Sequence, residues 1–356
     1  MAIREKGLYT GNGPLRSGSG NSDLHNNEST DLGGLAVFHA YTILSLSRYG
    51  FASLLRLPLI CGLIAAAHAQ GARAAQDTSP AAPTVTSTAP RDLQVNVGYQ
   101  FDDNVTRAGA SADQLSDQSI SLDLSKRFIF QLNANTRALL SFNLDGEKFR
   151  NFDGLSRITA GVQGEWQYRA SAAFDAPTFA VFGRVAAEQF QSDLRDGYRY
   201  AIGVSVQQAL TDRISLFGAL SHNGRNADNA VFDGQDNAVR LNLDYRINAA
   251  NTFYLGAEFR RGDSVTTATP SNENAAIATA LVRNDDAYPG RQFTSYRCDG
   301  DTVLTTLGYN LAVNAQSSLD CSWRRIRTTP DLRENLVAVP SRYSAHQYSV
   351  VYLLRF

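Results

Sequence analysis

The chain ends in the stretch YSVVYLLRF, which runs from Tyr348 to Phe356. Successive side chains of a β-strand point to opposite faces, so residues two apart share a face. Every second residue here is apolar or aromatic, beginning with Tyr348 and ending with the final Phe356. The stretch therefore predicts a closing strand with one continuous apolar face.

The same period of two recurs upstream, with apolar residues on one face and polar residues on the other. It is clearest at Leu93–Phe101, where Gln94, Asn96 and Gly98 separate the apolar positions. Ten further segments repeat it: 120–124, 140–144, 158–168, 181–185, 200–206, 214–220, 239–247, 253–259, 303–311 and 319–323. Together with the first and last segments they predict twelve strands.

The connections between these segments alternate in length. Long ones fall near 103–116, 146–154, 190–197, 223–236, 264–300 and 327–343. Short ones fall near 129–135, 170–176, 210–213, 248–251 and 314–317. Alternating short turns and long loops with an even strand number are typical of transmembrane barrels, whose closure leaves no backbone edge unpaired in lipid. We therefore expect an all-β fold, a single antiparallel up-and-down transmembrane β-barrel of about twelve strands over residues 92–356. A soluble β-sandwich is the alternative.

The segments before residue 92 have a different character. Two arginines precede an apolar run of eleven residues, Leu57–Ala67, and small residues frame a cleavage site after Ala69. This order is typical of a secretory signal peptide. We expect residues 1–69 to be a leader and signal peptide and residues 70–91, rich in Pro, Ala, Ser and Thr, to be a disordered periplasmic linker.

Two stretches resemble known families. The terminal strand is similar to that of Gram-negative outer-membrane β-barrels, which implies an outer-membrane location, contact with lipid and lipopolysaccharide, and recognition by the barrel-assembly machinery. The residues carrying that assembly signal would be Tyr348, Val350, Tyr352, Leu354 and Phe356. The stretch GYQFDDNVTR (Gly98–Arg107) resembles the opening strand of barrels from surface-lipoprotein and exopolysaccharide export proteins, in which a helical-repeat domain usually precedes the barrel. A linker precedes it here.

The composition excludes other classes. The chain has 33 basic and 34 acidic side chains, and this balance argues against a nucleic-acid partner. No apolar run reaches 18 residues, which excludes a bundle of membrane helices. After residue 69 only His222 and His346 remain, and neither a G-x-S-x-G nor an H-E-x-x-H motif is present. We expect no enzymatic activity, no catalytic residue, no metal site and no cofactor.

Charged residues of both signs occupy the polar faces of the predicted strands. We expect these to line the lumen: Arg157, Glu165, Arg169, Arg184, Glu188, Arg199, Arg240, Asp244, Arg246, Glu258, Arg260 and Arg324. The favoured function is a passive channel, porin-like, for small polar solutes. The alternatives are a closed structural or adhesion barrel that works through its loops, and export of a polysaccharide or lipoprotein. Residues 264–300 would form the longest loop, which either folds inward or covers the surface.

Overall fold

The computed structural model of the protein describes residues 93–331 and 342–356. They form thirteen strands, a six-residue helix α1 (Asn272–Ile277) and two short 3-10 turns. Among the described residues, no helix has the length and apolar character needed to cross a membrane. The expected leader, signal peptide and linker at 1–69 and 70–91 lie outside the described residues.

The strands follow one another along the chain with few interruptions. They are β1 (Leu93–Asp102), β2 (Asp117–Asn133), β3 (Thr136–Phe149), β4 (Arg157–Arg169), β5 (Thr178–Phe190), β6 (Gly197–Ala209), β7 (Ile214–Ala227), β8 (Gly234–Arg246), β9 (Asn251–Ala268), β10 (Ala280–Arg283), β11 (Thr294–Asn314), β12 (Ser317–Pro330) and β13 (Tyr343–Arg355).

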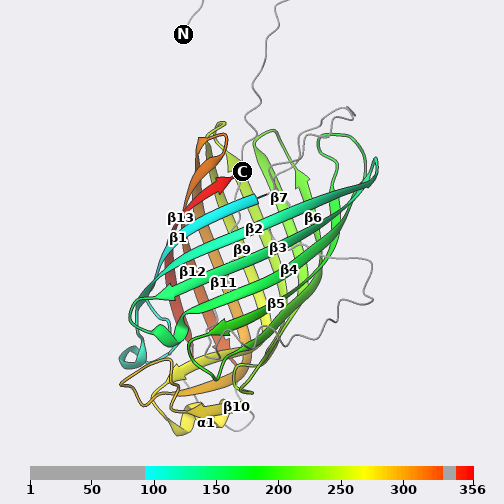
Figure 1. The fold of residues 1–356 in the computed structure, drawn as a ribbon. Coiled ribbons are helices and arrows are strands. Elements are labelled where there is room, and N and C mark those ends of the chain that lie inside the picture. Colours follow the sequence, from blue (N-terminus) through cyan, green and yellow to red (C-terminus); the bar gives the residue numbers. More distant parts are fainter. Residues whose placement is uncertain (1–92, 332–341) are drawn as a thin grey trace, which may run out of the picture. The chain divides into compact units, whose positions relative to one another are not determined.

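The sheet closes on itself. Strands β1 to β9 pair in sequence order, β9 pairs with β11, and β11 to β13 lead back to β1. Strand β10 pairs only with β11 and stands outside this ring, so twelve of the thirteen described strands form the barrel wall. All pairings are antiparallel, and β1 meets β13 in a regular register from Gln94↔Arg355 to Asp102↔Gln347. The predicted twelve-stranded antiparallel barrel is confirmed (Figure 1).

The apolar faces of the strands point outward. Ile120, Leu122 and Ile158 are each about half exposed, whereas the polar residues between such positions are more buried. Exposed aromatic side chains follow one another on neighbouring strands at one end: Tyr245 lies opposite Phe253, and Tyr168 opposite Phe179. An outward apolar band with an aromatic girdle is the surface that a barrel presents to lipid.

The two ends of the barrel differ. The beginning of β1, the end of β13 and the short turns lie at one end, which we call the turn end. The helix α1 and β10 lie at the opposite end, the loop end (Figure 1). In outer-membrane barrels the long loops face the exterior.

Several strands run further than the sequence predicts. The expected loop at 223–236 shrinks to the residues between Ala227 and Gly234, and the expected loop at 264–300 shrinks to 269–293. For β11 the physical reason is burial on both faces. Ser295 and Tyr296, adjacent residues on opposite faces of β11, are 0% and 1% exposed. Where both faces are covered, an apolar–polar alternation is no longer required, so the period of two disappears from the sequence.

Candidate functional site

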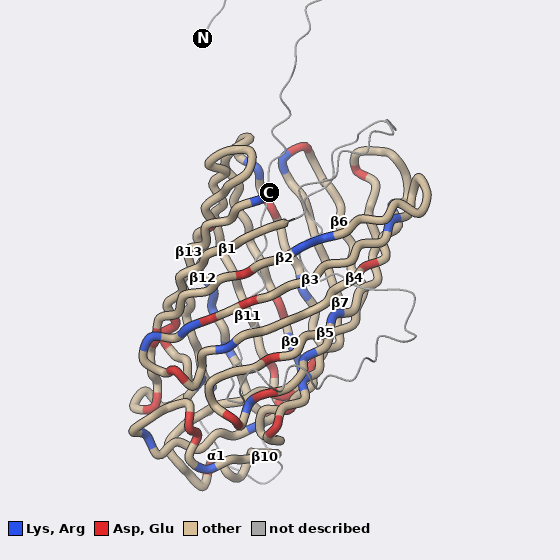
Figure 2. The backbone as a smooth tube through the Cα atoms, viewed as in Figure 1, with Lys and Arg blue, Asp and Glu red and all other residues tan. Residues whose placement is uncertain are grey.

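The polar interior of the barrel is the first part of the candidate site. All twelve residues expected to line the lumen lie on wall strands, at positions that alternate with the outward apolar side chains. On β4, for example, Ile158 and Val162 are exposed whereas Thr159 and Glu165 are each 2% exposed. Charges of both signs occur along the strands (Figure 2).

The structure brings seven of the twelve residues close together. Glu188 on β5 accepts ion pairs from Arg199 (3.4 Å) and from Arg225 (3.2 Å). Glu258 on β9 does the same for Arg240 (2.6 Å) and Arg260 (2.5 Å). Arg184 and Arg324 complete the group, because both interact electrostatically with Glu258, Arg240 and Arg260. We call the group Arg184, Glu188, Arg199, Arg225, Arg240, Glu258, Arg260 and Arg324 the lumen cluster.

The other five predicted residues lie apart from it. Arg157 pairs with Glu147 of β3 at 2.8 Å. Glu165 accepts a hydrogen bond from Gln167, and Asp244 accepts one from Ser215 at 3.3 Å. Near the turn end, Arg169 donates to the carbonyl oxygen of Ala173 at 2.9 Å, and Arg246 is exposed at the end of β8.

The ion pairs of the lumen follow the wall. Arg157–Glu147, Arg199–Glu188 and Arg240–Glu258 each join neighbouring strands, and Arg260–Glu258 lies within one strand. Arg225–Glu188 joins β7 to β5, two strands apart. Opposite walls of the barrel are six strands apart, so none of these five pairs reaches across the lumen.

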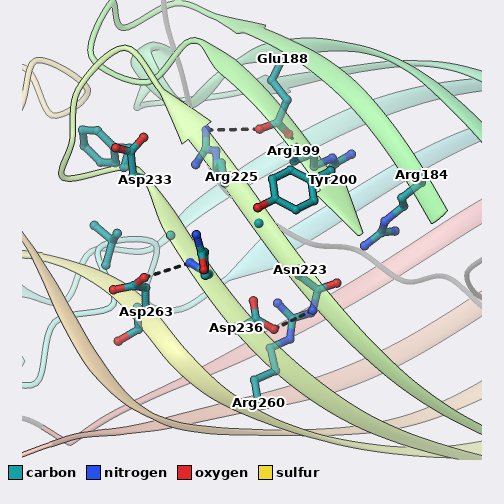
Figure 3. A pocket seen from close by; sticks show the side chains of 16 residues that line it. Arg184, Glu188, Arg199, Tyr200, Asn223, Arg225, Asp233, Asp236, Arg260 and Asp263 are labelled. Atoms are coloured by element: carbon teal, nitrogen blue, oxygen red, sulfur yellow. Dashed lines mark hydrogen bonds and ion pairs between the residues drawn. The ribbon is translucent and has the colours of Figure 1, made fainter. Parts of the chain in front are cut away.

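A cavity of about 100 Å³ opens beside the lumen cluster. Arg184, Arg199, Arg225 and Arg260 line it together with residues from the loop-end parts of β7, β8 and β9. Figure 3 shows Arg184 on one side of the cavity and Asp233 and Asp263 on the other.

The second part of the candidate site is the cap, which we define as residues 269–293 between β9 and β11. Ala287, Tyr288 and Phe293 of this segment form a buried cluster with Phe149 and Leu155 at the β3–β4 connection. Six wall strands separate the β9–β11 junction from that connection in either direction, namely β4 to β9 one way and β11 through β13 to β3 the other way. The cap therefore crosses the mouth of the barrel from one wall to the opposite one.

Polar contacts hold the cap on two further sides. Asp285 forms a buried ion pair with Arg195 of the β5–β6 connection, and it accepts a hydrogen bond from Ser295 at 2.6 Å. Thr269 donates to Asp113 of the β1–β2 connection through its backbone N–H at 3.0 Å and through its hydroxyl at 2.5 Å. The cap is thus attached to three other connections at the loop end: β1–β2, β3–β4 and β5–β6.

The stretch that resembles export barrels is part of this attachment. Asp102 at the end of β1 pairs with Arg107 at 2.6 Å and accepts a hydrogen bond from Gln347 of β13 at 2.7 Å. The backbone carbonyl oxygens of Thr106 and Arg107 accept hydrogen bonds from β9, from the N–H of Thr267 at 2.8 Å and the hydroxyl of Thr266 at 2.6 Å. Residues 102–107 therefore join β1, β13 and β9 beneath the cap.

Four functional candidates escape the sequence prediction: Arg225, Arg195, Asp285 and Asp236 of β8, which lines the cavity. The phase of Leu216 and Leu220 would place Arg225 inside if β7 were extended to Ala227, so a signal for it exists. Arg195 and Asp285 lie in irregular connections, where no periodicity marks them. Among the described residues, no group of three His, Cys, Asp or Glu side chains is arranged to hold a metal ion.

The closed wall, the outward apolar band and the polar interior define an outer-membrane β-barrel. Residues 91–295, more than half of the chain, match the family described as surface lipoprotein assembly modifier. The chain belongs to this family. A comparison of the sequence with curated proteins finds no match.

An outer-membrane channel and two porins are among the solved structures that match this chain. The COG4313 outer membrane channel from Pseudomonas putida F1 is 12% identical, with a TM-score of 0.46 over 78% of this chain and 100% of that one. The KdgM porin in complex with disordered oligogalacturonate is 10% identical, with a TM-score of 0.40 over 74% of this chain and 99% of that one. The NanC porin is 11% identical, with a TM-score of 0.39 over 74% of this chain and 100% of that one.

Proposed function

We propose that the protein is a gated outer-membrane channel for small polar solutes, with the barrel interior as the passage and the cap as the gate. The observation that carries the proposal is the direction of the contacts in the two parts of the site. The ion pairs described in the lumen run along the wall, whereas the contacts of the cap run across the mouth. The interior would then conduct when the cap leaves the mouth.

A link between the two parts supports gating. Arg225 pairs with Glu188 in the lumen and donates a hydrogen bond to the backbone carbonyl oxygen of Arg195 at 3.0 Å. The side chain of Arg195 in turn pairs with Asp285 of the cap. A solute that draws Arg225 away from Glu188 would disturb the segment that holds the cap, so binding and opening would be coupled.

Conductance of the purified protein in planar bilayers tests the proposal, with Gly154→Ala as the opening variant. A Cβ atom at Gly154 would lie 2.3 Å from the Cα of Ala287, a backbone atom that cannot rotate away, so the cap and the β3–β4 connection must separate. Gly146→Ala is the matched control, because a Cβ atom there meets nothing within 4 Å. We expect brief openings for the wild type and for Gly146→Ala, and a several-fold longer open time for Gly154→Ala.

Bilayers that stay silent for all three proteins would contradict the channel. Insertion must be verified in the same samples by heat-modifiable mobility on gels, so that silence is not mistaken for failed insertion. Equal open times for the two glycine variants would reject the cap as the gate, and the proposal that the barrel interior conducts would still hold.

Membership of the surface lipoprotein assembly modifier family favours a second candidate, a role in delivering lipoproteins to the cell surface. The matched residues extend from the segment before β1 into β11 and include residues 102–107 beneath the cap. The test is protease accessibility of a co-expressed lipoprotein on intact cells, with and without this protein. Unchanged accessibility would reject this role.

A further inference from the structure

The arginines of the lumen cluster outnumber the acids that neutralise them. Around the cavity, Arg199 and Arg225 share Glu188, and Arg240 and Arg260 share Glu258. The surrounding acids have partners of their own. Asp263 pairs with Arg297 at 3.6 Å, Asp236 accepts from Asn223 at 2.7 Å, and Asp233 accepts from the backbone N–H of Ala227 at 2.6 Å.

Arg184 is an arginine of the lumen cluster to which these acids give no ion pair. Among the described residues it has neither an ion pair nor a side-chain hydrogen bond. Its electrostatic neighbours include Arg199, Arg240 and Arg260, which repel it, and Glu258, which already serves two arginines. Together with Arg297, the lumen cluster contributes seven arginines, which face five carboxylates: Glu188, Glu258, Asp233, Asp236 and Asp263. A positive charge among other positive charges in a partly dehydrated lumen is stabilised by a mobile anion.

The position of Arg184 allows such an anion to reach it. Its side chain is partly exposed, and it lines the cavity of about 100 Å³. That volume corresponds to roughly three water molecules, enough for one small oxyanion group. A guanidinium group donates two parallel hydrogen bonds to a carboxylate, sulfate or phosphate group, a geometry that a chloride ion cannot use.

We propose that Arg184 and the neighbouring arginines of the lumen cluster form a binding site for the oxyanion group of a solute: a carboxylate, sulfate or phosphate. This inference deepens the proposed channel and rests on it for its physiological meaning, since the site would favour anionic solutes on their way through the lumen. Binding itself can be measured without any conduction.

Equilibrium dialysis with radiolabelled sulfate, on the purified full-length protein in detergent, tests the site. Arg184→Gln is the informative variant, because it removes the charge without breaking an ion pair among the described residues. We expect sulfate affinity to fall at least about ten-fold, the loss that corresponds to one hydrogen bond with a charged group. Arg169→Gln removes a luminal arginine near the turn end and should leave sulfate binding unchanged.

Equal sulfate affinity of the wild type and Arg184→Gln would overturn the site, as would an equal loss in Arg169→Gln. The reversal potential in a potassium chloride gradient then separates the two proposals. If the barrel conducts without preferring anions and binds no sulfate, the oxyanion site is rejected and the channel proposal is retained. If the barrel binds sulfate through Arg184 but shows no conductance, the oxyanion site is retained and the channel proposal is rejected.

Discussion

Arg195 and Asp285 form an ion pair that is almost completely buried at the loop end, although 90 residues separate them in sequence. The side chains are 2% and 0% exposed. The guanidinium group also lies over the ring of Phe232, 4.3 Å from its centroid. Asp285 accepts further hydrogen bonds from Ser295 and from the backbone N–H of Ala287. This pair fixes the centre of the cap to the β5–β6 connection.

Arg195→Ala should release the cap while the barrel stays folded. Removing one partner of a buried pair leaves an uncompensated charge and costs about 3–5 kcal/mol. Hydrogen–deuterium exchange should then show a loss of protection by about 100-fold or more in residues 269–293. Lys148→Ala is the control, since its ion pair with Asp153 is exposed on both sides and adds little. Unchanged protection in Arg195→Ala would show that the apolar cluster alone holds the cap.

Tyr288 makes the cap sensitive to alkaline pH. Burial raises the pKa of its phenol, and its hydroxyl donates to the carbonyl oxygen of Val105 at 3.0 Å. A phenol with a raised pKa contributes its full stability below the unfolded pKa of about 10 and loses it as the pH rises further. We expect exchange in residues 269–293 to accelerate above pH 10 beyond the intrinsic rate. In Tyr288→Phe this pH dependence should be absent, and its persistence would assign the effect to another group.

Tyr254 ties three strands of the wall together. Its side chain crosses β11 at Gly308, and its hydroxyl donates to Asp320 of β12 at 2.8 Å. A Cβ atom at Gly308 would lie 2.0 Å from the ring, so Gly308→Ala must displace it and leave Asp320, 1% exposed, without this donor. We expect a loss of about 1–3 kcal/mol in the free energy of unfolding, measured by urea titration in detergent.

Gly218→Ala provides the comparison for Gly308→Ala. A Cβ atom at Gly218 meets its nearest neighbour, Leu241, at 3.5 Å, an ordinary van der Waals contact. Its unfolding midpoint should match that of the wild type. Should both alanine variants unfold at the same urea concentration as the wild type, the contact between Tyr254 and Asp320 carries no stability.

The alternation of apolar and polar residues could be recognised wherever one face of a strand meets lipid and the other faces the polar lumen. Outward residues such as Ile120 and Leu122 are apolar and alternating ones such as Asp123 are polar, so the number of wall strands followed from the sequence. Pairing within the lumen could not be predicted in this way. It depends on the stagger between strands, which periodicity in one strand does not reveal.

The sequence of the cap and of the adjoining part of β11 shows no alternation of apolar and polar residues. Ser295 and Tyr296 are buried on both faces of β11, and Arg195, the ion-pair partner of Asp285, comes from the distant β5–β6 connection. Contacts of this kind are determined by which loops the closed barrel brings together, and closure is a property of the whole sheet. The sequence therefore predicted a long connection near 264–300 but neither its strand extensions nor its course across the mouth.

Phe356 offers a test of the proposed assembly signal that separates recognition from stability. Its side chain is 58% exposed, whereas its backbone N–H donates to the carbonyl oxygen of Leu93 at 2.9 Å. Phe356→Ala removes the ring and keeps that hydrogen bond, so the refolded barrel should unfold at the same urea concentration as the wild type. If the barrel-assembly machinery reads the ring, the amount of folded protein in the outer membrane should fall several-fold. Phe174→Ala, which truncates an exposed phenylalanine in the β4–β5 turn at the same end, should reach wild-type levels. Equal outer-membrane levels for Phe356→Ala and the wild type would mean that the last side chain is not part of the signal.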